Sequence, residues 1–188
     1  ETDVWNMVTF GVVAVVTTIF TMSIKIRSIA QSRQIEYLSQ TDVLTGLKNR
    51  NHYENQLRKY PDMFTRNLIC VYGDTNGLHE LNNRYGHHAG DRMLREVAKA
   101  IQQCFGTEHT YRIGGDEFAI LLPNSSKEDL EVLKDKCRKL NSVVKAKRKE
   151  LPKFTLSIGI AFGEDNDDTD TLFKKADKAL YFVKENGD

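Results

Sequence analysis

Two glycines and two adjacent carboxylates stand between apolar segments in YRIGGDEFAILLP, residues 111–123. An Asp-Glu pair beside an apolar run repels itself and loses hydration, so it needs either open water or a cation. A second apolar run, LICVYGD, ends at Asp74. If the two segments are neighbouring strands, Asp74 converges with Asp116 and Glu117, and three such close negative charges require divalent cations. Ligands that are all oxygen favour Mg²⁺ or Mn²⁺.

The glycines add a second chemical property to this stretch. Because Gly114 and Gly115 carry no Cβ, the backbone there can approach a flat ring or a phosphate closely. Metals together with close backbone access indicate a nucleoside triphosphate. The alternative is that GGDE is only a polar turn, since Gly and Asp are common in turns. Residue chemistry alone leaves both interpretations open.

Hydrophobic periodicity predicts the elements that would position these groups. Two apolar segments joined by Gly114 and Gly115 are typical of a tight hairpin, whose tip would carry the carboxylates. Asp91 is expected to be the N-cap of a helix with apolar residues at helical spacing. Together these elements predict one α/β sandwich with a largely antiparallel sheet. The predicted strands and helices are residues 68–74 (strand), 91–105 (helix), 110–113 and 117–123 (hairpin arms), 126–144 (helix), 154–163 (strand) and 170–184 (helix).

The N-terminal segment has a different composition. From Val4 to Ile24 there is no charged residue, and at about 1.5 Å per residue this run is long enough to cross a hydrocarbon core of roughly 30 Å. A cleaved signal peptide, a buried pair of strands or a core helix are the alternatives. Basic residues follow the run at Lys25, Arg27 and Arg33, which predicts that everything downstream is cytoplasmic. We therefore expect a cell-membrane (inner-membrane) protein with one span in this chain.

A helical linker is predicted between the span and the globular part. KIRSIAQSRQIEYLSQ has no Pro or Gly, and its spacing of four and three predicts a weak two-stranded coiled-coil seam, although a solvated helical linker explains the pattern nearly as well. The expected division is a span at 1–25, a linker at 26–40 and a globular domain at 41–188. The seam positions are Ile24, Ser28, Gln31, Ile35 and Leu38.

Composition excludes several classes of protein. The 188 residues allow one ordinary domain plus an appendage, and 27 basic against 26 acidic residues give no electrostatic reason to expect nucleic-acid binding. Three cysteines without a C-x-x-C spacing favour reduced thiols in the core, rather than a disulfide frame or a zinc site. The chain begins at Glu1 instead of Met, so we expect it to be a piece of a longer protein.

Five motifs resemble those of the GGDEF-domain diguanylate cyclases and follow one another along the chain in the family's order. The likeness covers about residues 38–187. RIGGDEF, residues 112–118, resembles the family's signature. The other four are TDVLTGLKNR (41–50), DTNGLHELNNRYGHHAGD (74–91), LSIGIAF (156–162) and ADKALYFVK (176–184).

The resemblance implies a palm-like sheet, similar to class III nucleotidyl cyclases, that is flanked by helices and preceded here by the transmembrane helix and linker. It implies condensation of two GTP into cyclic di-GMP with release of pyrophosphate, in a homodimer in which each domain binds one GTP. Asp74, Asp116 and Glu117 would be catalytic and, with Thr75, would hold two Mg²⁺ (or Mn²⁺). The residues implied to bind substrate are Asn82 and Asp91 at the guanine edge, Gly114 and Gly115 at the hairpin, and Lys184 at a phosphate.

Some positions depart from the family pattern. The expected inhibitory Arg-x-x-Asp falls on FGTE, residues 105–108, so product inhibition by that route should be missing. His79 and Asp188 stand where the family often has Lys and Arg, which could weaken phosphate binding. A degenerate domain that binds GTP or a partner protein without catalysis is therefore the alternative, and a membrane-anchored scaffold without nucleotide affinity is a third possibility.

Overall fold

The computed structural model describes residues 2–59, 67–145, 154–164 and 167–186. The chain divides into two compact units, Glu1–Ser39 and Gln40–Asp188. The first unit consists of helix α1 (Thr2–Gln40), which is continuous over the predicted span and the predicted linker. Pairing of the linker with that of a second copy remains a prediction.

Hydroxyl side chains in α1 donate hydrogen bonds to their own helix. Thr18 Oγ1 donates to Ala14 O at 2.7 Å, and Ser23 Oγ donates to Ile19 O at 2.8 Å, so these polar groups are satisfied without an external partner. Large apolar side chains are exposed along the helix, among them Phe10 and Phe20. The stretch Thr9–Glu36 is long and apolar enough to cross a membrane, a property that some signal sequences and core helices share.

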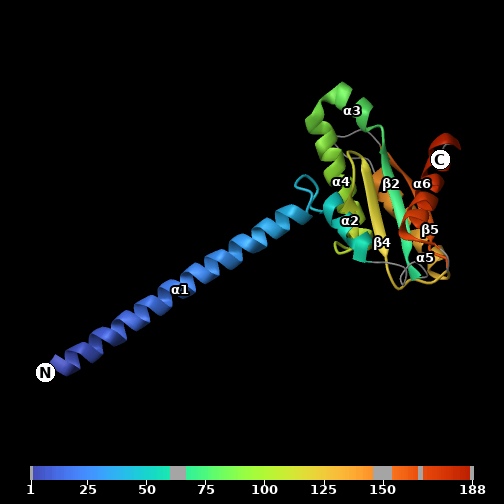
Figure 1. Ribbon diagram of the computed structural model, residues 1–188. Helices are drawn as coiled ribbons and strands as arrows, with labels where there is room; N and C mark the ends of the chain where they lie inside the picture. Colours follow the sequence, from blue (N-terminus) through green and yellow to red (C-terminus); the bar gives the residue numbers. More distant parts are fainter. Residues whose placement is uncertain (1, 60–66, 146–153, 165–166, 187–188) are drawn as a thin grey trace. The chain divides into compact units, whose positions relative to one another are not determined.

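The second unit is built on a five-stranded sheet with the order β1-β3-β4-β2-β5. Figure 1 shows β4, β2 and β5 side by side. Only β1 and β3 run parallel; every other neighbouring pair is antiparallel, as predicted. The apolar strands expected around the carboxylates occupy the interior of the sheet. The strands are β1 (Lys48–Asn49), β2 (Ile69–Asn76), β3 (Thr110–Arg112), β4 (Glu117–Leu122) and β5 (Thr155–Phe162).

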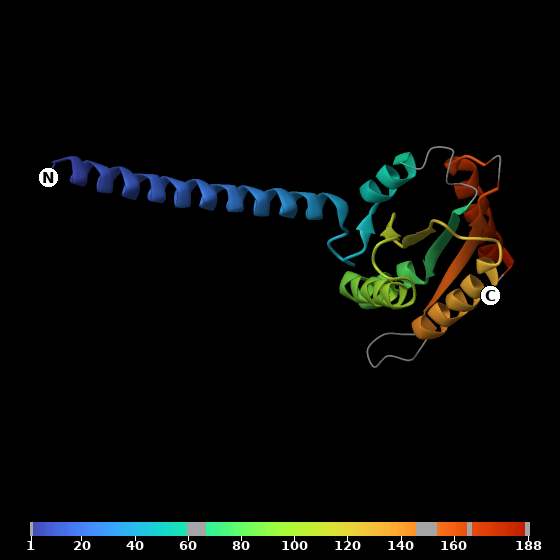
Figure 2. The same ribbon diagram turned by 90° about the horizontal axis from the view of Figure 1, so that it is seen from below.

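Helices cover both faces of this sheet. Figure 2 shows α2 (Arg50–Lys59) and α6 (Thr169–Asn186) on one side, and α4 (His87–Phe105) and α5 (Asp129–Lys145) on the other. Because alternate strand residues point to opposite faces, Val71 packs under α4 and α5 while Tyr72 packs under α2 and α6.

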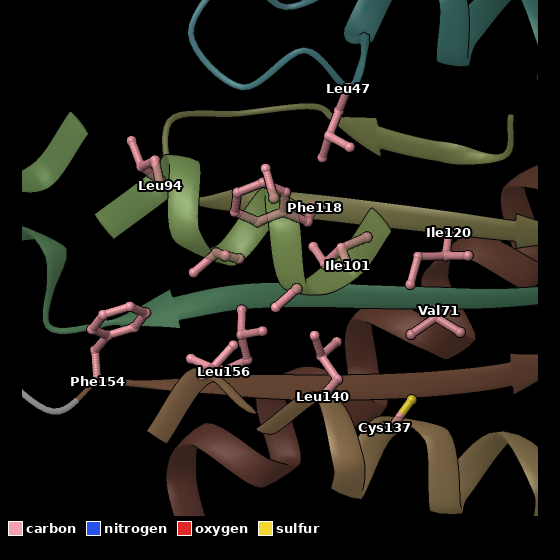
Figure 3. Packing of buried hydrophobic residues seen from close by; sticks show 14 of the residues in the cluster. Leu47, Val71, Leu94, Ile101, Phe118, Ile120, Cys137, Leu140, Phe154 and Leu156 are labelled. Atoms are coloured by element: carbon pink, nitrogen blue, oxygen red, sulfur yellow. The ribbon is translucent and has the colours of Figure 1, made fainter. Parts of the chain in front are cut away.

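Two hydrophobic clusters result from this layering. The larger lies between the sheet and the α4–α5 layer, where Phe118, Ile101 and Leu140 approach one another from a strand and two helices (Figure 3). Cys137 belongs to this cluster and Cys70 to the cluster on the other face, as predicted for core side chains. Cys104 is only half-buried and packs against the larger cluster.

Helix α6 lies unusually close to β5 because of one glycine. A Cβ at Gly159 would collide with the backbone carbonyl of Ala176 and the backbone nitrogen of Leu180, and would lie 3.0 Å from Leu180 Cα. The missing side chain therefore allows direct contact between the helix backbone and the strand. This contact fixes the height of α6, which carries Lys184, against the sheet.

Two local predictions are wrong. Helix α4 begins at His87, so Asp91 lies in its second turn and is not the N-cap. The cap position is Gly86, whose φ is 80°. This single residue separates α4 from helix α3 (Leu78–Tyr85), which was not predicted. The hairpin is present, but its connection comprises residues 113–116, and neither of its glycines adopts the positive φ of a tight primed turn.

Candidate active site

The carboxylates at the end of the sheet come from adjacent strands. Asp74 in β2 pairs in register with Glu117, the first residue of β4. The backbone continues this pairing beyond the strand, because Thr75 N donates to Asp116 O at 3.1 Å, and Ile113 N closes the hairpin by donating to Glu117 O at 3.0 Å. The predicted neighbourhood of the two strands is confirmed.

Lys184 of α6 forms an ion pair with Asp74. Its Nζ lies 2.8 Å from Asp74 Oδ2, and the side chain of Asp74 is only 12% exposed. Burial raises the pKa of Asp74 above its ordinary value; the hydrogen bond from Lys184 opposes this shift, and the charge of Asp116 adds to it. Asp74 is therefore a desolvated carboxylate whose charge is balanced by one movable ammonium group.

Gly114 makes room for Glu117. A Cβ at position 114 would collide with Glu117 Oε2 and would lie 3.0 Å from its Cδ, so any other residue would push the carboxylate away from its present position. A Cβ at Gly115 would meet nothing within 4 Å, which leaves open space beside the hairpin tip. The two glycines thus have different roles: one positions a carboxylate and the other leaves the approach free.

The donor set fits a hard divalent cation in its chemistry. Asp74, Asp116 and Glu117 supply only oxygen, the ligand type that Mg²⁺ prefers. The Thr75 hydroxyl is directed at the Asp116 carbonyl, 3.4 Å away. Within the described part of the chain, no group of three or more His, Cys, Asp or Glu side chains is gathered tightly enough to hold a metal. In this arrangement the ammonium of Lys184 is the cation that neutralises Asp74.

Asn82 presents an unused acceptor between α3 and α4. Its Oδ1 atom is buried and has no hydrogen-bond partner among the residues that the structure describes. A Cβ at Gly90 would collide with this atom and lie 3.0 Å from Leu78 Cδ1, so the glycine makes room for the amide. A buried polar atom without a partner costs free energy, which is explained if a ligand normally supplies the donor. Asp91, half-buried, is the next residue along α4.

A second ion pair ties the hairpin to the start of the domain. Both Asp42 carboxylate oxygens accept from Arg112 Nη1, at 3.1 and 3.2 Å, and Arg112 Nη2 donates to Gly115 O at 2.7 Å. Asp42 also accepts from the backbone N of Thr45 at 2.9 Å. This link was not predicted, although Asp42 and Arg112 both belong to motifs that resemble the family.

The positions that depart from the family pattern have local partners. His79 Nε2 lies 3.0 Å from Asn83 Nδ2, on the exposed side of α3. Phe105 is half-buried, and Lys136 Nζ lies 5.9 Å from the centre of its ring, so an aromatic contact is found where the inhibitory Arg was expected. Asp188 lies outside the described residues.

A scan against protein families matches residues 39–188 to the GGDEF domain of diguanylate cyclases. Among similar proteins, diguanylate cyclase DgcM of Escherichia coli (strain K12) is 34% identical over 160 residues, which are 82% of this chain and 38% of that protein. Cyclic di-GMP phosphodiesterase PdeB of Shewanella oneidensis is 35% identical over 157 residues, again 82% of this chain but 18% of that protein. The chain thus spans less than half of either relative.

Solved structures share the fold. The coiled coil and GGDEF domain of DgcB from Caulobacter crescentus, in complex with c-di-GMP, superposes with a TM-score of 0.74 at 23% identity, covering 89% of this chain and 92% of that one. The GGDEF domain of TpbB (YfiN) from Pseudomonas aeruginosa superposes with a TM-score of 0.66 at 31% identity, covering 78% and 90%. These likenesses confirm the predicted palm-like sheet with flanking helices.

Proposed function

The chain belongs to the GGDEF family of diguanylate cyclases, and on that premise we propose that it condenses two GTP into cyclic di-GMP with release of two pyrophosphates. One observation carries the proposal: Asp74 and Glu117 pair in register beside a glycine hairpin and within reach of Lys184. Acidic oxygens, accessible backbone and the ammonium group of Lys184 at one end of the sheet support the proposal.

Each side chain has a task in this proposal. Asp74, Thr75, Asp116 and Glu117 would hold Mg²⁺ or Mn²⁺, which when bound activates the ribose 3′-hydroxyl and stabilises the leaving pyrophosphate. Lys184 would exchange Asp74 for a nucleotide phosphate, while Gly115 leaves the backbone accessible to it. The catalytic contribution of the protein is then mainly positioning and charge stabilisation.

We assign guanine selectivity to the region where α3 and α4 meet, which contains Asn82 and Asp91. Asp91 can accept hydrogen bonds from the N1 and N2 hydrogens of guanine, which adenine does not offer at the same edge. The buried acceptor of Asn82 would find its missing donor on the base. GTP should therefore be preferred over ATP.

The whole chain is proposed to act as a membrane-anchored dimer. Because each domain holds one GTP, two copies must bring their nucleotides face to face for the reaction. Residues 1–25 would cross the membrane once, residues 26–40 would form the helical signalling linker, and the domain at 41–188 would lie in the cytoplasm. The apolar stretch of α1 and the basic residues that follow it support this arrangement.

A catalytically degenerate domain that binds GTP or another protein is the second candidate. One relative of similar identity is named a phosphodiesterase, and it shares only 18% of its length with this chain, so the likeness alone does not fix the activity. The intact Gly114-Gly115-Asp116-Glu117-Phe118 favours catalysis, whereas His79 and Asp188 favour the degenerate domain.

Incubation of the dimeric protein with GTP and Mg²⁺ tests the proposal, with cyclic di-GMP and pyrophosphate as the products to be measured. Asp116→Ala and Glu117→Ala should each lower the rate by at least about 100-fold, since each removes a carboxylate that is proposed to hold the divalent cation. Circular dichroism should show an unchanged fold. An active variant at either position would refute the metal assignment, and GTP binding without product would favour the degenerate domain.

A further inference from the structure

Arg50 lies at the same end of the sheet as the carboxylates. Strand pairing aligns Asn49 with Arg112, Arg112 with Phe118, and Phe118 with Gly73 across four strands. Arg50 follows Asn49, Glu117 precedes Phe118 and Asp74 follows Gly73. Arg50, Glu117 and Asp74 therefore lie one position beyond this row, at the end of the sheet that carries the candidate site.

Arg50 also belongs to the correct face. It is the first residue of α2, and Tyr53, one turn later, packs edge-on against Tyr111 with ring centres 5.2 Å apart, in the cluster that contains Tyr72. Asp74 is two residues from Tyr72 along β2, so its side chain points to the same face. The carboxylates are thus framed by the start of α2, with Arg50, and the end of α6, with Lys184.

Glu54 now holds the Arg50 guanidinium through an exposed contact. Arg50 Nε lies 2.9 Å from Glu54 Oε1, and the two side chains are 72% and 44% exposed. The pKa of Arg50 is raised chiefly by Glu54, and also by more distant groups that include Glu117. Exposed pairs of this kind contribute little to stability, so the guanidinium can change partners at small cost.

We infer that Arg50 is a phosphate-binding residue of this site, whose guanidinium leaves Glu54 for a phosphate of the incoming nucleotide. Guanidinium groups suit phosphate because their planar donors bind two oxygens at once. Arg50 and Lys184 then bind the phosphates from opposite sides of the carboxylates. The inference rests on the proposed function, because it names a further residue that holds the substrate.

Two variants of the same ion pair separate this role from a structural one. Arg50→Ala and Glu54→Gln both abolish the same ion pair, so if the pair were purely structural, neither variant should affect nucleotide binding more than the other. If Arg50 binds phosphate, Arg50→Ala should weaken the binding of a non-hydrolysable GTP analogue with Mg²⁺ at least tenfold, while Glu54→Gln should bind it as tightly as wild type or more tightly. Calorimetry on the full chain measures both affinities.

Arg138→Ala is the matched control, because Arg138 forms a similar exposed pair with Asp135 on α5, which covers the other face of the sheet. It should leave affinity unchanged. The loss caused by Arg50→Ala should be smaller for GMP, which has a single phosphate. Equal affinities of wild type and Arg50→Ala, or equal losses for Arg50→Ala and Glu54→Gln, would overturn this inference alone. A wild-type chain that binds no analogue would overturn the proposed function and this inference together.

Discussion

Two carboxyl groups near the hairpin have pKa values shifted in opposite directions. Burial dominates at Asp74 and raises its pKa, whereas at Asp42 the effect of burial is outweighed by hydrogen bonds from Thr45 and by Arg112, which lower it. The difference matches their proposed roles. The charge of Asp42 is stabilised by its hydrogen bonds and by Arg112, as suits a structural anion. The charge of Asp74 is stabilised less completely, as suits a ligand for a divalent cation.

The Asp42 anion should make stability depend on pH. A lowered folded-state pKa contributes stability that is present above the ordinary value of 3.8 and is lost as the pH falls through the folded value. Asp42→Asn should therefore lower the free energy of unfolding at pH 7 by about 1–3 kcal/mol, because Arg112, only 13% exposed, loses its counter-charge. Urea unfolding at pH 7 and near pH 3 measures the difference.

The gap between wild type and Asp42→Asn should shrink at the lower pH, because below pH 3.8 the unfolded wild-type chain binds a proton at Asp42 more readily than the folded chain does. Asp135→Asn, on an exposed surface pair with a side chain 76% exposed, should have almost no effect at either pH. A gap of constant size at both values would show that Asp42 acts through shape and not through charge.

For single residues, the sequence predicted which carboxylates lie close together but not which neighbouring residues position the side chains of the site. Asp74 and Glu117 could be brought together because both flank apolar strands that had to be neighbours. The contact of Gly90 with Asn82 could not, since it depends on how closely α3 and α4 cross. Neither could the placement of Lys184 on Asp74, because it depends on the height of α6 above the sheet.

Among elements, the long and strongly periodic ones were predicted and the short ones were missed. Helices α5 and α6 and strands β2 and β5 lie within three residues of their predicted bounds, because each buries a regular apolar pattern. Helix α3 was missed because it has only 8 residues and buries only Leu81, which leaves too few apolar positions to reveal a helical period. Strand β1 has only two residues, too few for any period.

The contact of α6 with β5 leads to a prediction about one methyl group. Gly159→Ala places a Cβ against the backbone of Ala176 and Leu180, which cannot yield as a side-chain tip would. We expect a loss of about 1–3 kcal/mol in the free energy of unfolding, the usual cost of overpacking. Urea denaturation provides the measurement, and cyclase activity should fall with it because Lys184 moves away from the sheet.

Gly73→Ala is the control for this variant. Its Cβ would meet only two carbonyl oxygens, of Ser157 at 3.8 Å and Phe118 at 3.9 Å, which are ordinary contact distances. The two substitutions are chemically identical and lie on neighbouring strands of the same sheet. If they destabilise the protein equally, the close approach of α6 is not the cause.

For the whole molecule, the proposed requirement for two copies predicts a dependence on concentration. The part from Gln40 onward forms a compact unit without the rest of α1. Expressed alone, this unit should turn over GTP at a rate per chain that rises with protein concentration, since two loaded domains must meet. A version joined to a strong dimeric coiled coil should work at its full rate at every concentration. Steady-state assays over a hundredfold range of protein measure this.

A rate per chain that is the same at all concentrations of the isolated unit would contradict the two-copy requirement. The weak coiled-coil seam predicted in α1 agrees with this proposal. A coiled coil of low dimer affinity would allow an input signal to control dimerisation.

The ion pair between Lys184 and Asp74 has a thermodynamic consequence for loading. Magnesium would have to compete with an ammonium group for Asp74, and a nucleotide alone would have to compete with a carboxylate for Lys184. When both arrive together, each releases the partner that the other needs, so their binding should be mutually cooperative, and by linkage the enhancement is the same in either order. A domain without nucleotide would then bind free magnesium weakly, and would bind the complex of magnesium with the nucleotide tightly.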